Sequence, residues 1–328
     1  MKAWQMQKLG DPWEDLTCNK VNLPAVSDAV CRVQVEAADL NFADILQCQG
    51  NYQVRLEPPF TPGMNAAGTV MEAGENSQFK PGDKIVGPCY KTSGGYAEEC
   101  LIAAKGANLL PEGVDPRLAA AIHVTYGTGW FGLHLRGELQ PDDSVLVLAG
   151  AGGVGSAAID LARVHGCRVI AAAGGSEKTA ACRALGADAV VDYNAEDLYE
   201  RVMEITDGRG VDVVYDPVGG DYFDVARRLV AWEGRYLIIG FAAGRIPTAP
   251  MNHALVKNYS LVGVHMGGYR GRDDTQFQHC YRELYQMVQA ERLNPLIDKV
   301  IGFDELPATL LQLANRETKG RVIFDPGK

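Results

Sequence analysis

Residues 144–155 read Ser144-Val-Leu-Val-Leu-Ala-Gly150-Ala-Gly152-Gly153-Val154-Gly155, and this stretch decides the fold. An apolar, strand-like run stops at a glycine cluster, and an alanine-rich, helix-favouring segment follows at 156–163. In a dinucleotide-binding turn the first glycine allows the tight turn, the second lets the backbone approach a pyrophosphate, and the third lets the helix pack on the strand. The N–H groups at the helix start then face the phosphates. Because the strand, the turn and the helix occur in order, we expect a nucleotide cofactor here, in preference to a glycine-rich turn without a ligand.

The segment after the next strand selects between the two nicotinamide cofactors. An NAD-selective site places Asp or Glu about twenty residues after the glycine turn, where it accepts from the ribose 2′-hydroxyl. This chain instead has Gly174-Gly175-Ser176-Glu177-Lys178. Small residues leave room for a 2′-phosphate, Ser176 can donate to it, and Lys178 can neutralise it. Glu177 falls in the expected first turn of the next helix, where the dipole favours acids. The sequence therefore predicts NADPH over NADH.

Length and charge limit the class of protein. The 328 residues are enough for two domains, and the net charge of −10 disfavours nucleic acid and anionic membranes as partners. No apolar run approaches the roughly 20 residues of a membrane span, and the N-terminal residues carry no signal-peptide core. The eight cysteines include no CxxC pair, which favours reduced structural thiols. We expect a cytoplasmic protein without membrane insertion.

The order of elements predicts an α/β protein with two parts. Residues up to about 118 show short strands separated by Gly and Pro, which is typical of a β-rich, barrel-like domain. Strands and helices then alternate from 145 to 240, which indicates βαβ units and a parallel sheet. A helix at 275–290 and a strand at 319–324 are expected in a tail that returns to the first domain. The predicted domains are 1–120 with 262–328, and 121–261.

Six stretches, one of them the end of the glycine turn quoted above, carry a resemblance to a known family. They are Asn41-Phe-Ala-Asp44, Gln49-Gly-Asn-Tyr52, Pro59-Phe-Thr-Pro-Gly63, Tyr126-Gly-Thr128, Ala151-Gly-Gly-Val-Gly155 and Ala184-Leu-Gly-Ala-Asp188. On these motifs the chain resembles the medium-chain dehydrogenase/reductase superfamily, in its zinc-free NADPH:quinone oxidoreductase (zeta-crystallin-like) branch. The resemblance implies a GroES-like β-rich catalytic domain, a Rossmann doubly wound nucleotide-binding domain, and a homodimer formed through an edge strand of the latter.

The positions of the family's catalytic zinc ligands hold unsuitable residues here. By motif alignment they are Asn41, Met64 with Asn65, and Val124. An amide and a thioether do not replace the thiolate and imidazole ligands of zinc. We therefore expect no metal.

Without zinc, the resemblance implies hydride transfer to a quinone or another conjugated carbonyl, with the nicotinamide supplying the chemistry. Tyr52 matches a proton-donating tyrosine of related enoyl reductases, although its ring could simply cover the barrel wall. Asn41 matches an active-site asparagine that donates to a carbonyl or holds the nicotinamide carboxamide, although it could be a satisfied turn residue. Asp44 is expected to tie the following helix or loop in place.

The resemblance also assigns the cofactor contacts. The pyrophosphate turn comprises Gly150, Gly152, Gly153, Val154 and Gly155. The 2′-phosphate end comprises Ser176, Lys178, Tyr193 and Arg316. The nicotinamide end comprises Thr125, Tyr126, Thr128, Gly240 and Phe241. Thr125 departs from the asparagine common in related reductases.

Two other functions stay open. The first is reduction of an enoyl-thioester or alkenal double bond, for which Arg55, Lys91 and Arg270 are the nearest candidates for a basic rim. The second is a non-catalytic, NADPH-binding structural or RNA-associated role, which the acidic charge disfavours.

Overall fold

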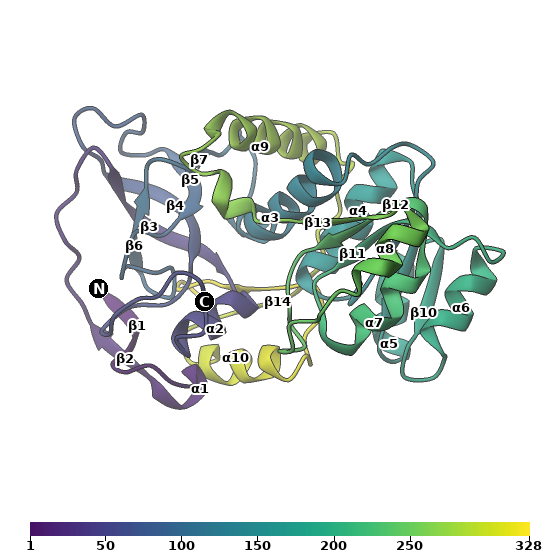
Figure 1. Ribbon diagram of the computed structural model, residues 1–328. Coiled ribbons are helices and arrows are strands. Elements are labelled where there is room, and N and C mark those ends of the chain that lie inside the picture. Colours follow the sequence, from purple (N-terminus) through teal and green to yellow (C-terminus); the bar gives the residue numbers. More distant parts are fainter. The chain divides into compact units, whose positions relative to one another are not determined.

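The computed structural model describes residues 1–328, which form two compact units (Figure 1). The first unit comprises Met1–Val124 and Ile297–Lys328, and the second comprises Thr125–Leu296. The chain therefore leaves the first unit once and returns to it at the end, as the sequence pattern predicts.

The first unit is built mainly of strands. The long β3 (Val30–Asp39) pairs antiparallel with its neighbours in a seven-stranded sheet. Figure 1 shows the yellow C-terminal segment among the purple and blue strands, where Ile323 pairs with Asp39 and Phe324 with Ala38. The remaining strands are β1 (Lys2–Met6), β2 (Leu16–Lys20), β4 (Asn65–Glu72), β5 (Lys84–Pro88), β6 (Glu99–Ala103), β7 (Asn108–Leu109), β14 (Ile297–Ile301) and β15 (Arg321–Phe324). The helices are α1 (Pro12–Asp15), α2 (Phe42–Cys48) and α10 (Leu306–Ala314).

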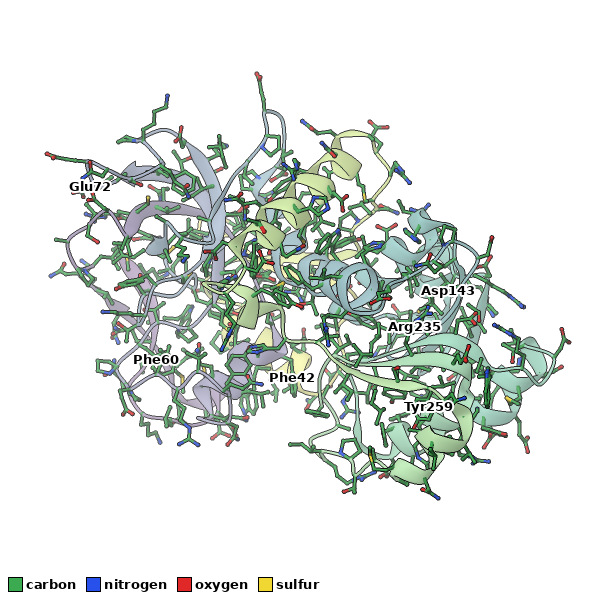
Figure 2. All side chains as sticks on the ribbon, turned by 45° about the horizontal axis from the view of Figure 1, so that its top comes forward. Phe42, Phe60, Glu72, Asp143, Arg235 and Tyr259 are labelled. Atoms are coloured by element: carbon green, nitrogen blue, oxygen red, sulfur yellow. The ribbon has the colours of Figure 1, made fainter.

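Aromatic side chains from distant parts of the chain fill the core of the first unit. Phe60, labelled in Figure 2, is completely buried in it. The ring of Phe324 lies 5.1 Å from Phe303 and 5.9 Å from Tyr96, both edge to face. The C-terminal strand is thus part of this core.

The second unit is a six-stranded parallel sheet with helices. Its strand order is β10-β9-β8-β11-β12-β13, the arrangement of a Rossmann doubly wound fold. The strands are β8 (Ser144–Val147), β9 (Arg168–Ala173), β10 (Ala189–Asp192), β11 (Val211–Asp216), β12 (Val230–Ile238) and β13 (Ser260–Gly263). The order reverses between β8 and β11, and ligands bind at the carboxyl ends of strands at such a point.

The helical elements complete the second unit, and the first of them starts in the first unit. They are α3 (Pro116–Trp130), η1 (Phe131–Arg136), α4 (Gly153–His165), α5 (Ser176–Ala184), α6 (Leu198–Ile205), α7 (Gly220–Leu229), α8 (Met251–Lys257), η2 (Met266–Tyr269) and α9 (Asp274–Gln289). No helix of the protein is both long and apolar enough to cross a bilayer.

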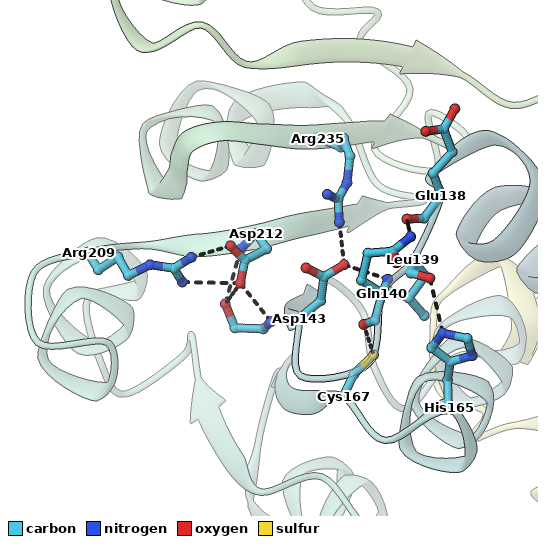
Figure 3. A network of polar contacts seen from close by, with 10 residues as sticks. Glu138, Leu139, Gln140, Asp143, His165, Cys167, Arg209, Asp212 and Arg235 are labelled. Atoms are coloured by element: carbon cyan, nitrogen blue, oxygen red, sulfur yellow. Dashed lines mark hydrogen bonds and ion pairs between the residues drawn. The ribbon is translucent and has the colours of Figure 1, made fainter.

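Ion pairs and hydrogen bonds tie the amino ends of the central strands (Figure 3). The backbone N–H and hydroxyl of Ser144, at the start of β8, donate to Asp212 at 2.9 and 2.7 Å. Arg209 also binds Asp212, and Arg235 of β12 binds Asp143 (Figures 2 and 3). This charged network therefore lies at the edge of the sheet opposite to the carboxyl ends.

The domain boundaries differ from the expected ones. Residues 262–296, expected in the first domain, belong to the second unit, and the first boundary falls at Val124. The reason is that α9 packs against η1 and the end of α3 in the second unit. The ring centroids of Phe277 in α9 and Phe131 in η1 are 5.1 Å apart, and the Trp130 indole N–H donates to Glu283 at 2.6 Å. A helix pattern predicts α9 but does not reveal which surface covers it.

Candidate active site

The glycine turn after β8 has the geometry expected of a phosphate-binding turn. A Cβ atom at Gly155 would lie 2.2 Å from the carbonyl oxygen of Ala149, so α4 approaches the turn too closely for any side chain. At Gly152, the N-cap of α4, the nearest atom to a Cβ would be 3.3 Å away and no other lies within 4 Å. The backbone at Gly152 can therefore be approached from outside, while Gly155 is needed for packing.

The loop between β9 and α5 is held by an acid of the neighbouring strand. The Asp192 carboxylate, at the end of β10, accepts from the backbone N–H groups of Gly175 at 2.8 Å and Asn194 at 3.0 Å. Gly175 has a φ of 89°, which favours glycine, and Ser176 then begins α5. The sequence places Asp192 at the end of a strand, but only the structure shows that its carboxylate accepts a hydrogen bond from the backbone N–H of Gly175.

Tyr193 lies against this same loop. A Cβ at Gly174 would lie 2.8 Å from the Tyr193 ring, and the ring packs edge to face on Tyr222 of α7 at 5.1 Å. The second unit thus brings Tyr193 together with the segment that carries Ser176 and Lys178. Glu177 lies in the first turn of α5, as expected. Arg316, after α10 in the first unit, has a φ of 61°.

The carboxyl ends of β11 and β12 are joined by a buried carboxylate. Asp216 accepts from the N–H groups of Val218 at 2.7 Å and Gly219 at 2.9 Å, and from the Tyr236 hydroxyl at 2.6 Å. Burial raises the pKa of Asp216, and these donors oppose the rise. Gly240 and Phe241 follow β12, and the Phe241 side chain is 39% exposed. Asp216 therefore fixes a loop beside the segment expected to contact nicotinamide.

In α3, Tyr126 is engaged inside the second unit. Its hydroxyl donates at 2.8 Å to Asp160 of α4, whose other oxygen accepts from Arg163 at 2.7 Å. Tyr126 is 2% exposed and Thr125 is fully buried, whereas Thr128 is half-buried. The Tyr126 hydroxyl is thus committed to a structural bond, and the sequence carried no signal for this pairing.

Asn41 and Asp44 form a buried polar centre at the start of α2. The Asp44 carboxylate accepts from the N–H of Asn41 at 2.8 Å, the N–H of Met64 at 2.9 Å and the Tyr96 hydroxyl at 2.8 Å. Asp44 ties the helix start to two other segments, which is the role expected from the sequence. The Asn41 side-chain oxygen accepts from Arg321 of β15 at 2.9 Å, a contact that sequence reasoning missed. Tyr52 is half-buried in a bend after α2.

Burial dominates the electrostatics of this centre. Desolvation, with the charge of Asp39 as a second cause, raises the pKa of Asp44 to about 6. Desolvation and the adjacent Asp44 also raise the pKa of Tyr96, so its hydroxyl keeps its proton. The Asp39 carboxyl has a raised pKa as well, because burial outweighs the opposing effect of Arg321.

The donor set does not suit a metal ion. The chain contains no group of three His, Cys, Asp or Glu residues that could hold one. At the position expected for a zinc-binding imidazole, the residue is Met64, whose backbone N–H is bonded to Asp44. The residues present therefore do not fit a catalytic zinc.

Together, the β-rich unit, the Rossmann unit and the glycine turn define a two-domain nucleotide-dependent oxidoreductase. Two family models match the chain: "Alcohol dehydrogenase GroES-like domain" over residues 27–127 and "Zinc-binding dehydrogenase" over residues 153–289. The chain belongs to the medium-chain dehydrogenase/reductase superfamily, in its zinc-free quinone oxidoreductase branch.

Relatives and solved structures cover almost the whole chain. "Quinone oxidoreductase-like protein 2" of Bos taurus is 39% identical over 334 residues, covering 98% of this chain and 94% of that protein. The Escherichia coli quinone oxidoreductase complexed with NADPH has a TM-score of 0.88 at 26% identity, covering 99% of this chain and 100% of that one. The Thermus thermophilus quinone oxidoreductase, also described in complex with NADPH, has a TM-score of 0.83 at 31% identity, covering 99% of this chain and 100% of that one.

The raised pKa of Asp44 predicts a pH-dependent stability. Between pH of about 4 and about 6, the folded state retains a proton that the unfolded state releases, so the free energy of unfolding falls as pH rises through this window. Two pKa units correspond to about 3 kcal/mol. Urea unfolding of the wild type and Asp44→Asn at several pH values measures this. The free energy of unfolding of the wild type minus that of Asp44→Asn should fall by that amount from about pH 4 to about pH 6. Hydrogen bonds from Asn76 lower the pKa of the exposed Asp28, so the free energy of unfolding of the wild type minus that of Asp28→Asn should rise with pH instead. A constant difference for Asp44→Asn would contradict the prediction.

Proposed function

We propose that this oxidoreductase uses NADPH to reduce quinones or related conjugated carbonyl compounds, without a metal. The observation that carries the proposal is the turn after β8, where Gly155 admits no side chain and the backbone at Gly152 can be approached from outside. Its position at the carboxyl end of a central strand of the parallel sheet suits a pyrophosphate.

The absence of an acid at positions 174–176 supports the preference for NADPH. Gly174, Gly175 and Ser176 leave space at the end of β9, and Lys178 supplies a positive charge in the first turn of α5. The Asp192 carboxylate beside this loop accepts from two backbone N–H groups. The NADPH complexes among the solved relatives are in line with this choice.

The bound nicotinamide would supply a hydride, and the protein would stabilise the negative charge that develops on the substrate oxygen. Asn41 can donate a side-chain N–H to that oxygen. Tyr52 can donate a proton where the substrate carbon needs one, as in reduction of an enone. Reduction of an enoyl thioester or alkenal is therefore the second candidate function, and Tyr52 is the residue that favours it.

The eight cysteines are all free thiols. Free thiols persist in reducing compartments. This supports the expectation that the protein works in the cytoplasm.

Apolar side chains on the second unit support a homodimer. On α8, Met251, Leu255 and Val256 are 71%, 78% and 68% exposed. Ile246, shortly before α8 in the chain, is 70% exposed, and Trp232 of β12 is 61% exposed. The neighbouring strand β13 is the last of its sheet and has one unpaired edge. Because an exposed apolar patch beside an open edge is a typical association surface, we propose that a second copy of this chain covers it.

Turnover tests the proposed reaction. With a chelator present throughout, we expect the loss of NADPH absorbance to be faster with benzoquinone or phenanthrenequinone than with an alkenal or crotonyl-CoA. Tyr52→Phe should slow enone turnover by roughly 100-fold, the usual value of a positioned proton donor, and leave quinone turnover nearly unchanged. Faster turnover of the alkenal or thioester would favour the second candidate. NADPH binding without any turnover would favour the non-catalytic role.

Coenzyme selectivity is tested by titrating NADPH and NADH separately with fluorescence. We expect NADPH to bind at least about tenfold tighter, since a charge-assisted contact to phosphate contributes about 1.5–3 kcal/mol. Lys178→Met should remove most of this preference, whereas Lys80→Met, in a turn of the first unit, should not change it. Equal affinity of the wild type for both coenzymes would refute the assignment.

The dimer is tested by the mass in solution, measured by light scattering during gel filtration. The wild type should have twice the mass of the chain, and Met251→Glu/Leu255→Glu should have the mass of one chain. Met71→Glu places the same charge on a side chain that is 51% exposed in the first unit, and it should stay dimeric. A monomeric wild type would rule out the proposal.

A further inference from the structure

A buried cluster of Asp39, Asn41 and Arg321 lies where β15 meets β3. We propose that Arg321 is a positioning residue, which holds the side-chain amide of Asn41 so that its N–H is offered to the substrate carbonyl oxygen. This inference rests on the function proposed above. It adds a residue from the last strand of the chain, which no recognised motif contains.

Strand pairing places Arg321 beside Asn41. Arg321 is the first residue of β15, and this strand runs antiparallel to β3 with Ile323 opposite Asp39. Arg321 is 6% exposed and Asp39 is fully buried. One terminal nitrogen, Nη2, donates both to Asp39 and to the side-chain oxygen of Asn41, the latter at 2.9 Å. Because its charge is paired inside the unit, the guanidinium has little freedom to turn away.

The guanidinium also determines which way the Asn41 amide faces. A guanidinium has donors only, so the Asn41 atom facing it must be the carbonyl oxygen. The amide nitrogen then lies on the other side, where one of its two N–H groups donates to the Asp39 carbonyl oxygen at 3.3 Å. The Asn41 side chain also hydrogen-bonds the Asp39 carboxyl, and this bond opposes the rise that burial causes in the pKa of that acid. We assign the second N–H of the amide to the substrate oxygen. The backbone of Asn41 is fixed independently by Asp44, so both ends of the residue are held.

The geometry of the ion pair argues against a purely stabilising role. A carboxylate and a guanidinium pair most strongly through two parallel hydrogen bonds. Here the Nε atom of Arg321 and the Oδ1 atom of Asp39 make no hydrogen bond, although both are buried. The guanidinium forgoes the second bond to Asp39, while the nitrogen that binds Asp39 also binds Asn41. This arrangement orients the amide at the expense of the ion pair.

The test compares Arg321→Met and Arg321→Lys with the wild type, using the quinone that the wild type reduces best. Arg321→Met should lower kcat by roughly 10- to 100-fold, somewhat less than the loss of an oxyanion donor itself, and leave the Kd for NADPH unchanged. Arg321→Lys retains a charged donor and should recover much of the loss. The matched control is Arg117→Met, because Arg117 pairs with Asp325 just beyond β15 but is not bonded to Asn41; it should turn over like the wild type.

A double-mutant cycle separates positioning from general stability. In an Asn41→Ala background, Arg321→Met should cause no further loss of kcat, since the group it orients is already gone. If Arg321→Met lowers kcat by the same factor in the wild-type and Asn41→Ala backgrounds, the inference is overturned. If Arg321→Met does not fold, Asp39→Asn/Arg321→Met removes both buried charges and enters the same cycle. A wild type that reduces nothing would count against the proposed function, whereas an active wild type matched by a fully active Arg321→Met would count against this inference alone.

Discussion

The antiparallel pairing of β15 with β3 is the contact on which the first unit depends. It closes the chain on itself, because β15 follows the whole second unit in sequence and still buries Phe324 completely against Tyr96 and Phe303. The entropy of closing a loop grows only slowly with its length, while burial of one large apolar side chain contributes about 1.5–3 kcal/mol. A nucleotide-binding unit can therefore be inserted between two parts of one β-rich unit. The same pairing delivers Arg321 to the polar centre at Asn41.

In the second unit, the two edges of the parallel sheet carry different chemistry. At the amino ends, side-chain ion pairs such as Asp143 with Arg235 hold the strands together. At the carboxyl ends, the half-buried Asp192 accepts backbone N–H groups from its own loop and from the neighbouring β9–α5 loop, and the buried Asp216 accepts them from its own loop. These carboxylates are thereby satisfied before any ligand binds, and they shape the loops. Gly152, the N-cap of α4, makes no side-chain capping hydrogen bond, which suits the anionic ligand that we propose for the glycine turn.

Local sequence signals predicted most elements but not their long-range partners. The alternation expected from 145 to 240 corresponds to the elements from β8 to β12, and the helix pattern at 275–290 corresponds to α9, because apolar periodicity is a local property. For the short α2 the sequence left a helix and a loop both open, although Asn41 and Asp44 stand at capping-box spacing. The burial of α9 against α3 and η1 had no local signal, and this misplaced the domain boundary. Arg321 was missed for the same reason, since its partners Asp39 and Asn41 lie 282 and 280 residues away.

The composition of the buried centre explains why a neutral donor suits this site. Asp39, Asp44 and Arg321 bring two acids and one base into a buried region. The raised pKa of Asp44 reflects its burial first and the negative charge of Asp39 second. A substrate oxygen that gains negative charge nearby would add to the cost of negative charge there unless a donor met it. In the proposed role, the Asn41 amide would meet it with an N–H that brings no net charge, while Arg321 holds its side-chain oxygen and Asp44 its backbone N–H. Related zinc enzymes stabilise the negative charge on the substrate oxygen with a metal ion. In the proposed mechanism, an oriented Asn41 N–H would stabilise it in this chain.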